Sequence, residues 1–226
     1  MVAPVQNIPD TWPRTETLAD LMSRVAEVPP ERVRMRPYPG TATESDLIRA
    51  NESKSGSLCE LVDAVLVEKP MGFYESRLAF VFITFLDAFL SDHDLGIGLA
   101  PDAMIRTKPG QVRLPDVCFY SWKHFPGRLL PKGSILNAVP DFAVEILSPT
   151  NTAKEMERKR KEYFEGGAKL VWELDPERRP VRVYKSAEDF AEVDENETLD
   201  GGTVLPGFTL PVRAWFDKAG RRAEDG

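Results

Sequence analysis

Apolar residues recur along the chain with two periods, one typical of helices and one typical of strands. The segment Tyr74–Ser91 is apolar on most faces of a helix, so it predicts a long buried helix. Segments 15–28 and 41–53 have amphipathic spacing and threonine residues suited to helix caps, and they predict two short helices. A further helix is predicted to begin at about Thr152.

Alternation of apolar and polar residues predicts strands in much of the remaining chain. Residues 113–122 have the pattern of one strand, and residues 58–70 that of two short strands that meet near Asp63 and Ala64. Further strands are predicted within segments 95–106, 139–147, 170–175, 180–186 and 199–212. We expect the charged segment from Asp217 onward to be a mobile tail.

The composition is typical of a globular protein, with 42% hydrophobic and 29% charged residues. A length of 226 residues suits one domain with a sizeable core. The formal net charge of −7 argues against a protein that coats DNA through a global basic field. It does not exclude a nuclease, because bound divalent cations and local basic residues can offset phosphate charge.

Cysteine usage and hydropathy indicate the cellular compartment. The chain has two cysteines, Cys59 and Cys118, both within predicted strands, which favours reduced thiols in the core. The first residues lack the basic and then apolar pattern of a signal peptide. The longest apolar stretch is interrupted by Asp87 and is too short to span a bilayer. We therefore expect a soluble, cytoplasmic protein that has no membrane partner.

The predicted strand at 139–147 contains one acidic residue, Glu145, among apolar neighbours. Burying a carboxylate costs free energy unless a metal ion or a basic side chain faces it. The following helix carries a candidate partner, Lys159, one turn after Glu155 and one turn before Tyr163, so these three residues share a helix face. This arrangement favours a metal-dependent enzyme over a purely structural domain.

A second carboxylate, Asp116, follows Pro115 in another predicted strand. If this strand pairs with the strand of Glu145, both carboxylates converge on one hard cation. Mg²⁺ typically takes one or two carboxylates, several waters and substrate phosphate oxygens. A nearby lysine such as Lys159 would orient water and stabilise negative charge as it develops. The two histidines and two cysteines lack the spacing of a zinc site.

Each candidate residue also has a structural interpretation. Asp116 can begin a strand, Glu145 can belong to a buried ion pair, and Lys159 can lie on a solvated helix face. Glu75 can interact favourably with the dipole of the long helix, and Glu60 can face solvent from its strand. Residue type and spacing alone leave these alternatives open.

The chain contains, in this order, the segments CELVDAVLVEK, RLPDVCFYS, PDFAVEILSPTNTAKEMERKRKEYFEGGAKLVWELDP and VRVYKS. Together they resemble the Uma2 family (DUF820) of the PD-(D/E)xK restriction-endonuclease-like superfamily. The resemblance covers about residues 44–216 and implies an α+β fold, a mixed β-sheet flanked by helices. It leaves residues 1–43 as an N-terminal extension, with an arm and a short helix, and residues 217–226 as a charged tail.

The resemblance assigns the candidate site residue by residue. It implies that Asp116 is the metal-binding acid of the PD motif and that Glu145 is the acid of the (D/E)xK motif. The chain departs from the superfamily at the motif lysine, because Leu147 stands two residues after Glu145. Lys159, on the following helix, is the implied substitute. Lys161 is the fallback, although it lies off the helix face of Lys159.

Two further acids and the activity are also implied by the resemblance. Glu75 is similar in position to an acid that supplies an additional metal ligand, and Glu60 is a weaker candidate. The implied function is a Mg²⁺- or Mn²⁺-dependent endonuclease that hydrolyses phosphodiester bonds of nucleic acid, with DNA expected, by metal-activated water. The alternatives are a non-catalytic module that binds nucleic acid or protein, and a hydrolase of small phosphoesters. Homodimerisation is left open.

Overall fold

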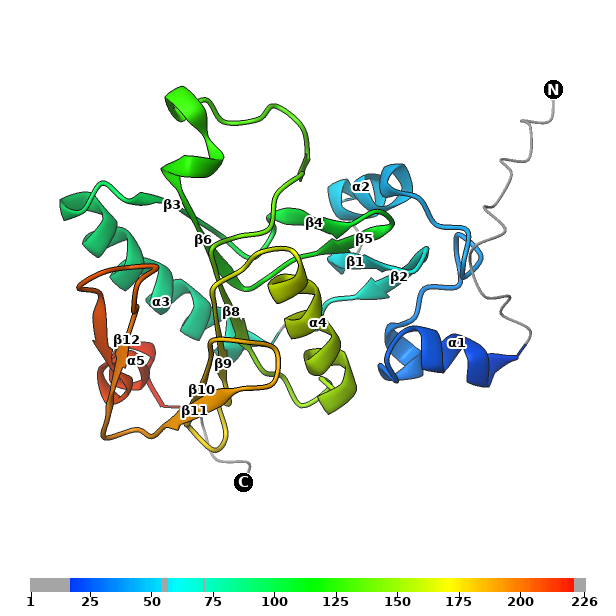
Figure 1. Cartoon of the computed structure of the whole chain (residues 1–226). Coiled ribbons are helices and arrows are strands. Elements are labelled where there is room, and N and C mark those ends of the chain that lie inside the picture. The colour runs from blue at the N-terminus through cyan, green and yellow to red at the C-terminus, as the bar shows by residue number, and fades with distance from the viewer. Residues whose placement is uncertain (1–16, 54–56, 71, 222–226) are drawn as a thin grey trace.

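The protein, described by a computed structural model over residues 17–53, 57–70 and 72–221, combines two larger β-sheets with helices and one short hairpin (Figure 1). The α-helices are α1 (Leu18–Arg24), α2 (Glu44–Glu52), α3 (Phe73–Asp92), α4 (Ala153–Glu165) and α5 (Val212–Ala219). Short 3₁₀ turns are η1 (Pro30–Arg32), η2 (Trp122–His124) and η3 (Pro126–Arg128). The described α-helices confirm those predicted within segments 15–28 and 41–53, over Tyr74–Ser91 and from about Thr152.

The larger sheet is six-stranded, with the order β11-β10-β9-β8-β6-β3. Strands β8 and β9 run parallel, and the other neighbours are antiparallel, so the sheet is mixed, as the resemblance implied. Its strands are β3 (Gly96–Leu99), β6 (Val117–Ser121), β8 (Phe142–Ile146), β9 (Leu170–Leu174), β10 (Val181–Tyr184) and β11 (Phe190–Val193).

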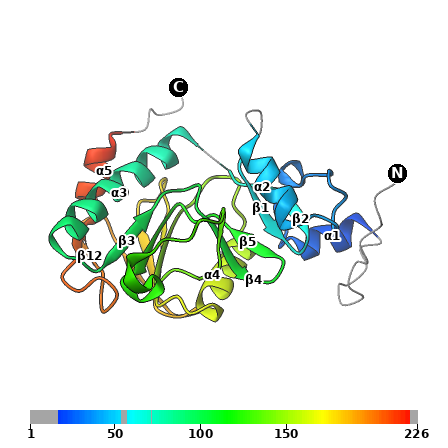
Figure 2. The same ribbon diagram turned by 90° about the horizontal axis from the view of Figure 1, so that it is seen from above.

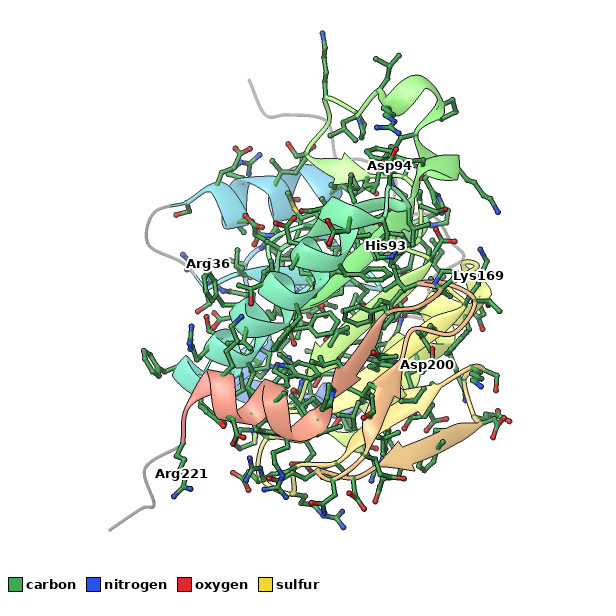
Figure 3. The ribbon with its side chains drawn as sticks, turned by 90° about the vertical axis from the view of Figure 1, so that its left-hand side faces the viewer. Arg36, His93, Asp94, Lys169, Asp200 and Arg221 are labelled. Atoms are coloured by element: carbon green, nitrogen blue, oxygen red, sulfur yellow. The ribbon has the colours of Figure 1, made fainter. Side chains whose placement is uncertain are left out.

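Helices cover both faces of this sheet, and the period of two along its strands determines which residues each face receives. On one face, Phe82 of α3 packs against Phe142 and Trp172, and Trp215 of α5 joins the same cluster. Figure 3 shows this side, with α3 and α5 in front of the sheet. Helix α4 lies on the opposite face, where Tyr163 packs in a separate core cluster, and Figure 2 shows the two helical layers from above.

The second sheet is five-stranded, with the order β2-β1-β5-β4-β7. Its strands are β1 (Cys59–Val62), β2 (Val65–Glu68), β4 (Met104–Lys108), β5 (Gln111–Arg113) and β7 (Ile135–Leu136). The predicted turn between β1 and β2 is confirmed, with Asp63 and Ala64 at φ values of 47° and 59°. Both residues have the left-handed backbone that tight two-residue hairpins require. A separate hairpin pairs β12 (Thr198–Asp200) with β13 (Thr209–Pro211).

The prediction of one strand over residues 113–122 is wrong. Arg113 ends β5 in the five-stranded sheet, and Val117 begins β6 in the six-stranded sheet. Between them, Pro115 has no N–H to donate to a ladder, and the N–H of Leu114 donates to the side chain of Glu60 at 3.1 Å. The chain therefore crosses from one sheet to the other at the residue before Asp116.

Two predictions about helices also need correction. Helix α3 is not buried on most faces, because Phe80 is 58% exposed and the fully buried positions lie along one side. The segment from Asp217 is not wholly a tail, because α5 continues to Ala219 and crosses the expected boundary at residue 216. Val212, Trp215 and Phe216 of α5 are buried with the spacing of one helix face.

Candidate active site

Asp116 and Glu145 lie beside each other at one end of the six-stranded sheet. Strands β6 and β8 are antiparallel neighbours, with Val117 opposite Val144, so the next position along brings Asp116 next to Glu145. The backbone N–H of Asp116 donates to the carbonyl of Val144 at 3.1 Å, and the N–H of Ile146 donates to Asp116 Oδ2 at 2.7 Å. The strand pairing that the sequence argument required is therefore present.

The other oxygen of Asp116 contacts a lysine that sequence reasoning did not single out. Lys69 directly follows β2, and its Nζ lies 2.8 Å from Asp116 Oδ1. The same ammonium donates to the carbonyl oxygen of Pro101 at 3.3 Å, and the Lys69 side chain is 4% exposed. The sequence offered one signal for Lys69, because it is a basic residue at the end of a buried strand, six residues before Glu75.

Glu145 is buried and holds two side-chain contacts from α4. Tyr163 donates its hydroxyl to Glu145 Oε1 at 2.6 Å, and Lys159 Nζ lies 3.3 Å from Oε2. Burial raises the pKa of Glu145 to about 7, with a further raising effect from the negative charge of Asp116, while the ammonium of Lys159 opposes both. Glu145 is thus an internal carboxyl group whose ionised form depends on nearby positive charge.

Glu60 shares the ammonium of Lys159 and is fully enclosed, which excludes the interpretation that it faces solvent. Its Oε1 lies 3.0 Å from Lys159 Nζ and accepts from the N–H of Leu114, and its Oε2 accepts from Arg113 Nη1 at 3.0 Å. Burial raises the pKa of Glu60, but the positive charges of Lys159 and Arg113 outweigh it and bring the pKa to about 2. Glu60 is therefore ionised at neutral pH.

Helix α4 places Glu155, Lys159 and Tyr163 on one buried face, as its spacing predicted. Glu155 receives a bidentate contact from Arg32, at 2.9 and 2.7 Å. Lys161 lies on the exposed side and pairs with Glu157 of its own helix. Of the two lysines considered for the motif position, Lys159 is the one in contact with Glu145.

Glu75 lies in the first turn of α3 and lines a small cavity together with Asp116. The cavity has a volume of about 30 Å³ and is lined by Lys69, Glu75, Asp116 and Ile146, among others. Such a volume is sufficient for one water molecule or one ion. Within the described part of the chain, no three side chains of His, Cys, Asp or Glu form a ready-made metal site. Glu75 is therefore not gathered with Asp116 and Glu145 into one cluster.

The chemistry of these residues fits a hard divalent cation. Asp116 and Glu75 present carboxylate groups to the cavity, and Glu145 lies directly beside Asp116. Carboxylate oxygens are preferred ligands of Mg²⁺ and Mn²⁺, and each such oxygen keeps a further lone pair beyond the one that accepts a hydrogen bond. Leu147 occupies the expected lysine position and lines a neighbouring hollow.

Two larger hollows adjoin the cavity through Glu75, which lines both. One has a volume of about 280 Å³ and is bounded by the first turn of α4 and by the guanidinium groups of Arg160 and Arg182. The other has a volume of about 510 Å³ and includes Phe73 and Pro149. The cavity at Asp116 therefore lies next to space in which a substrate can be accommodated.

The family model Uma2, described as "Putative restriction endonuclease", matches residues 45–213. The chain belongs to the Uma2 family. It is also similar to a solved structure described as "a putative nuclease belonging to DUF820 from Anabaena variabilis". That match has 16% sequence identity and a TM-score of 0.67, and it covers 78% of this chain and 98% of the other. No curated protein matches the chain.

Uma2 membership confirms the resemblance found in the sequence and supports a nuclease-like function. The solved DUF820 structure is similar in fold, and at 16% identity it shows the fold alone. Both cysteines of this Uma2 protein are free and buried, Cys59 in β1 and Cys118 in β6, as their positions suggested. Among the described helices, none is long and apolar enough to cross a membrane.

Proposed function

We propose that this Uma2 protein is a divalent-cation-dependent endonuclease that hydrolyses phosphodiester bonds of nucleic acid, with DNA as the substrate. The observation that supports the proposal is the placement of Asp116, directly before β6, beside Glu145 of the paired strand β8, with Asp116 and Glu75 lining one small cavity. Such a carboxylate pair at the ends of two paired strands is suited to holding a hard cation against a phosphate group.

Each residue has a distinct role in this proposal. Asp116 and Glu145 would hold Mg²⁺ or Mn²⁺ through their carboxylate oxygens, and Glu75, which lines the cavity at Asp116, would support the bound ion. The bound cation supplies Lewis acidity and lowers the pKa of a coordinated water. Lys159 holds Glu145 in position and offsets its negative charge, which favours the ionised carboxylate that a cation requires.

The reaction is addition of water to phosphorus with cleavage of one P–O ester bond. The water loses a proton, and the departing oxygen gains one. Arg160 and Arg182 line the hollow of about 280 Å³ beside Glu75, together with Glu173, Asp175 and Glu177, so a bound divalent cation is needed to offset the charge of a phosphate backbone there.

The central test is cleavage of plasmid DNA and of a single-stranded RNA in Mg²⁺ or Mn²⁺. Asp116→Asn and Glu145→Gln keep the size of each side chain and remove its charge, so cleavage should fall by about 100-fold or more. Asp141→Asn is the matched control, because Asp141 is also a buried acid and lies directly before β8, at the opposite end of that strand from Glu145. Circular dichroism verifies the fold of each variant. Wild-type cleavage rates in Asp116→Asn would refute the assignment.

The lysine assignment has its own test. Lys159→Met removes the ammonium that contacts Glu145, so cleavage should fall strongly while the exposed variant Lys161→Met keeps the wild-type rate. The comparison is made at equal fractions of folded protein, measured by thermal unfolding. Equal loss in both variants would contradict a specific role for Lys159.

One observation favours the alternative of a non-catalytic binding module. Every carboxylate oxygen of Asp116 and Glu145 already has a protein partner, and one of these partners is the ammonium of Lys69. Titration with Mn²⁺ separates the two functions. A binding module would show no Mn²⁺ site that depends on Asp116, and it would bind nucleic acid without cleaving it.

A further inference from the structure

Two buried lysines, from different parts of the fold, neutralise the two acids of the candidate site. Lys159 comes from α4 and contacts Glu145, whereas Lys69 follows β2 and contacts Asp116. The side chains are 3% and 4% exposed, so burial does not distinguish them. Their surroundings do.

Lys159 is enclosed between two carboxylates, at 3.0 Å from Glu60 and 3.3 Å from Glu145. Lys69 instead lines the cavity of about 30 Å³ together with Asp116 and Glu75. Its ammonium is held by one carboxylate and by the carbonyl of Pro101. Lys69 is thus the lysine that shares a cavity with the proposed metal ligands.

A divalent cation and the ammonium of Lys69 would bind the same carboxylate. Lys69 Nζ lies 2.8 Å from Asp116 Oδ1, so a second positive charge at this carboxylate meets strong repulsion at short range in a poorly solvated site. The two cations therefore compete for Asp116. Removal of the ammonium leaves the Asp116 carboxylate with one backbone N–H donor, from Ile146, and with no cationic side chain in contact with it.

We propose that Lys69 is the internal counter-ion of Asp116 and sets the affinity of this site for divalent cations. The proposal rests on the proposed function, because it takes Asp116 as a metal ligand. Lys69 holds Asp116 in place in the cation-free protein, and the free energy of that ion pair is subtracted from the free energy of cation binding. The metal affinity of the wild-type protein is consequently lower than its carboxylates alone would give.

The test is direct titration of the full chain with Mn²⁺, followed by electron paramagnetic resonance of the free ion. Lys69→Met and Lys69→Gln should bind Mn²⁺ about tenfold more tightly or better, because the competing charge is gone. Lys69→Arg keeps the charge and should stay within about threefold of the wild-type affinity. The two neutral variants are independent, so the test survives if one of them fails to fold.

Lys169→Met is the matched control. Lys169 Nζ lies 2.7 Å from Asp141 Oδ1, so this lysine also pairs with a buried aspartate, at the other end of β8. Its removal should leave the Mn²⁺ affinity unchanged. A similar gain of affinity in this variant would show a general charge effect and would overturn the proposal.

Asp116→Asn distinguishes failure of this inference from failure of the proposed function. If Asp116→Asn abolishes binding but neither neutral Lys69 variant binds more tightly, Lys69 is not a competitor and the proposed function stands. If Asp116→Asn binds Mn²⁺ like the wild type, or if the wild type and both neutral variants bind none, the proposed function fails together with this inference.

Discussion

Glu60 and Glu145 are two carboxylates that share one counter-ion and differ in charge state. Both contact the ammonium of Lys159, and they are 1% and 4% exposed. The pKa of Glu60 is nevertheless lowered to about 2, whereas that of Glu145 is raised to about 7. Neither depth nor the shared lysine explains the difference.

The remaining neighbours explain it. Glu60 also receives the guanidinium of Arg113 and a backbone N–H, which favour its ionised form. Glu145 has a neutral donor, Tyr163, and a second acid, Asp116, at its side. Protein groups therefore balance the negative charge of Glu60, which is one end of this cluster. The negative charge of Glu145, at the other end, is only partly balanced, so a further positive charge there would favour its ionised form. The Glu145 end is therefore the one where a metal ligand is expected.

The largest expected effect comes from removing the guanidinium that supports Glu60. Arg113→Met leaves Glu60 and Glu162 buried with fewer cations, and it should lower the free energy of unfolding by about 3–5 kcal/mol. Urea denaturation measures this change. Arg182→Met, which breaks an ion pair at the surface, should cost less than about 1 kcal/mol. Similar losses in both variants would contradict a special contribution of Arg113 to the burial of Glu60.

A pH titration of stability tests the Glu145 end. Because the folded-state pKa of Glu145 is raised from 4.5 to about 7, its contribution to stability is fully present below pH 4.5 and is lost as pH rises through 7. This loss amounts to about 3 kcal/mol. Glu145→Gln should lack it, so the variant gains stability relative to the wild type between pH 4.5 and pH 7 in urea denaturation. Parallel stability profiles would contradict the raised pKa.

Glu60 provides the opposite sign in the same titration. Its folded-state pKa is depressed from 4.5 to about 2, so its contribution is present above pH 4.5 and is lost as pH falls towards 2. Glu60→Gln should therefore flatten the acid side of the profile. The Glu60 variant thus changes the stability profile below pH 4.5, and the Glu145 variant changes it above pH 4.5.

The smallest expected effect is that of the hydroxyl on Glu145. Tyr163→Phe removes the hydrogen bond of 2.6 Å and should lower the free energy of unfolding by about 1 kcal/mol. Loss of a donor to the carboxylate should also raise the pKa of Glu145 further. Carboxyl carbon resonances followed by NMR against pH measure this pKa. A lowered pKa would indicate that the hydroxyl stabilises the protonated acid instead.

Local patterns predicted the strand of Glu145 and the helix of Lys159, but they merged the end of β5 and all of β6 into one strand around Asp116. Period two predicted that Asp116 and Glu145 can converge if their strands pair, and period 3.6 placed Lys159 on one helix face with Glu155 and Tyr163, which the structure shows to be buried. Pairing between β6 and β8 was a condition of that argument, and the structure meets it. The terminal helix was missed although Val212 and Trp215 have helical spacing, because the run is short and follows Pro211.

The contacts that tune the site were not available from the sequence. Lys69 and Asp116 are 47 positions apart in the sequence, and Arg113 reaches Glu60 across another long separation. A charged residue in a strand is usually solvated, so no local signal distinguishes one that is buried with a distant partner. The break at Pro115 had a local signal, but the change of sheet depends on tertiary pairing.

Arg32 lies outside residues 45–213, which the family model matches, yet its guanidinium is buried against Glu155 of α4. Thr152, which caps α4, also donates to the carbonyl of Ala26. A shortened protein that began at residue 45 would keep the buried acid and lose its cation, at a cost comparable to that of the Arg113 variant. The segment matched by the Uma2 family model therefore omits residues that pack against the helix carrying Lys159, because Arg32 and Ala26 both contact α4 or its N-cap.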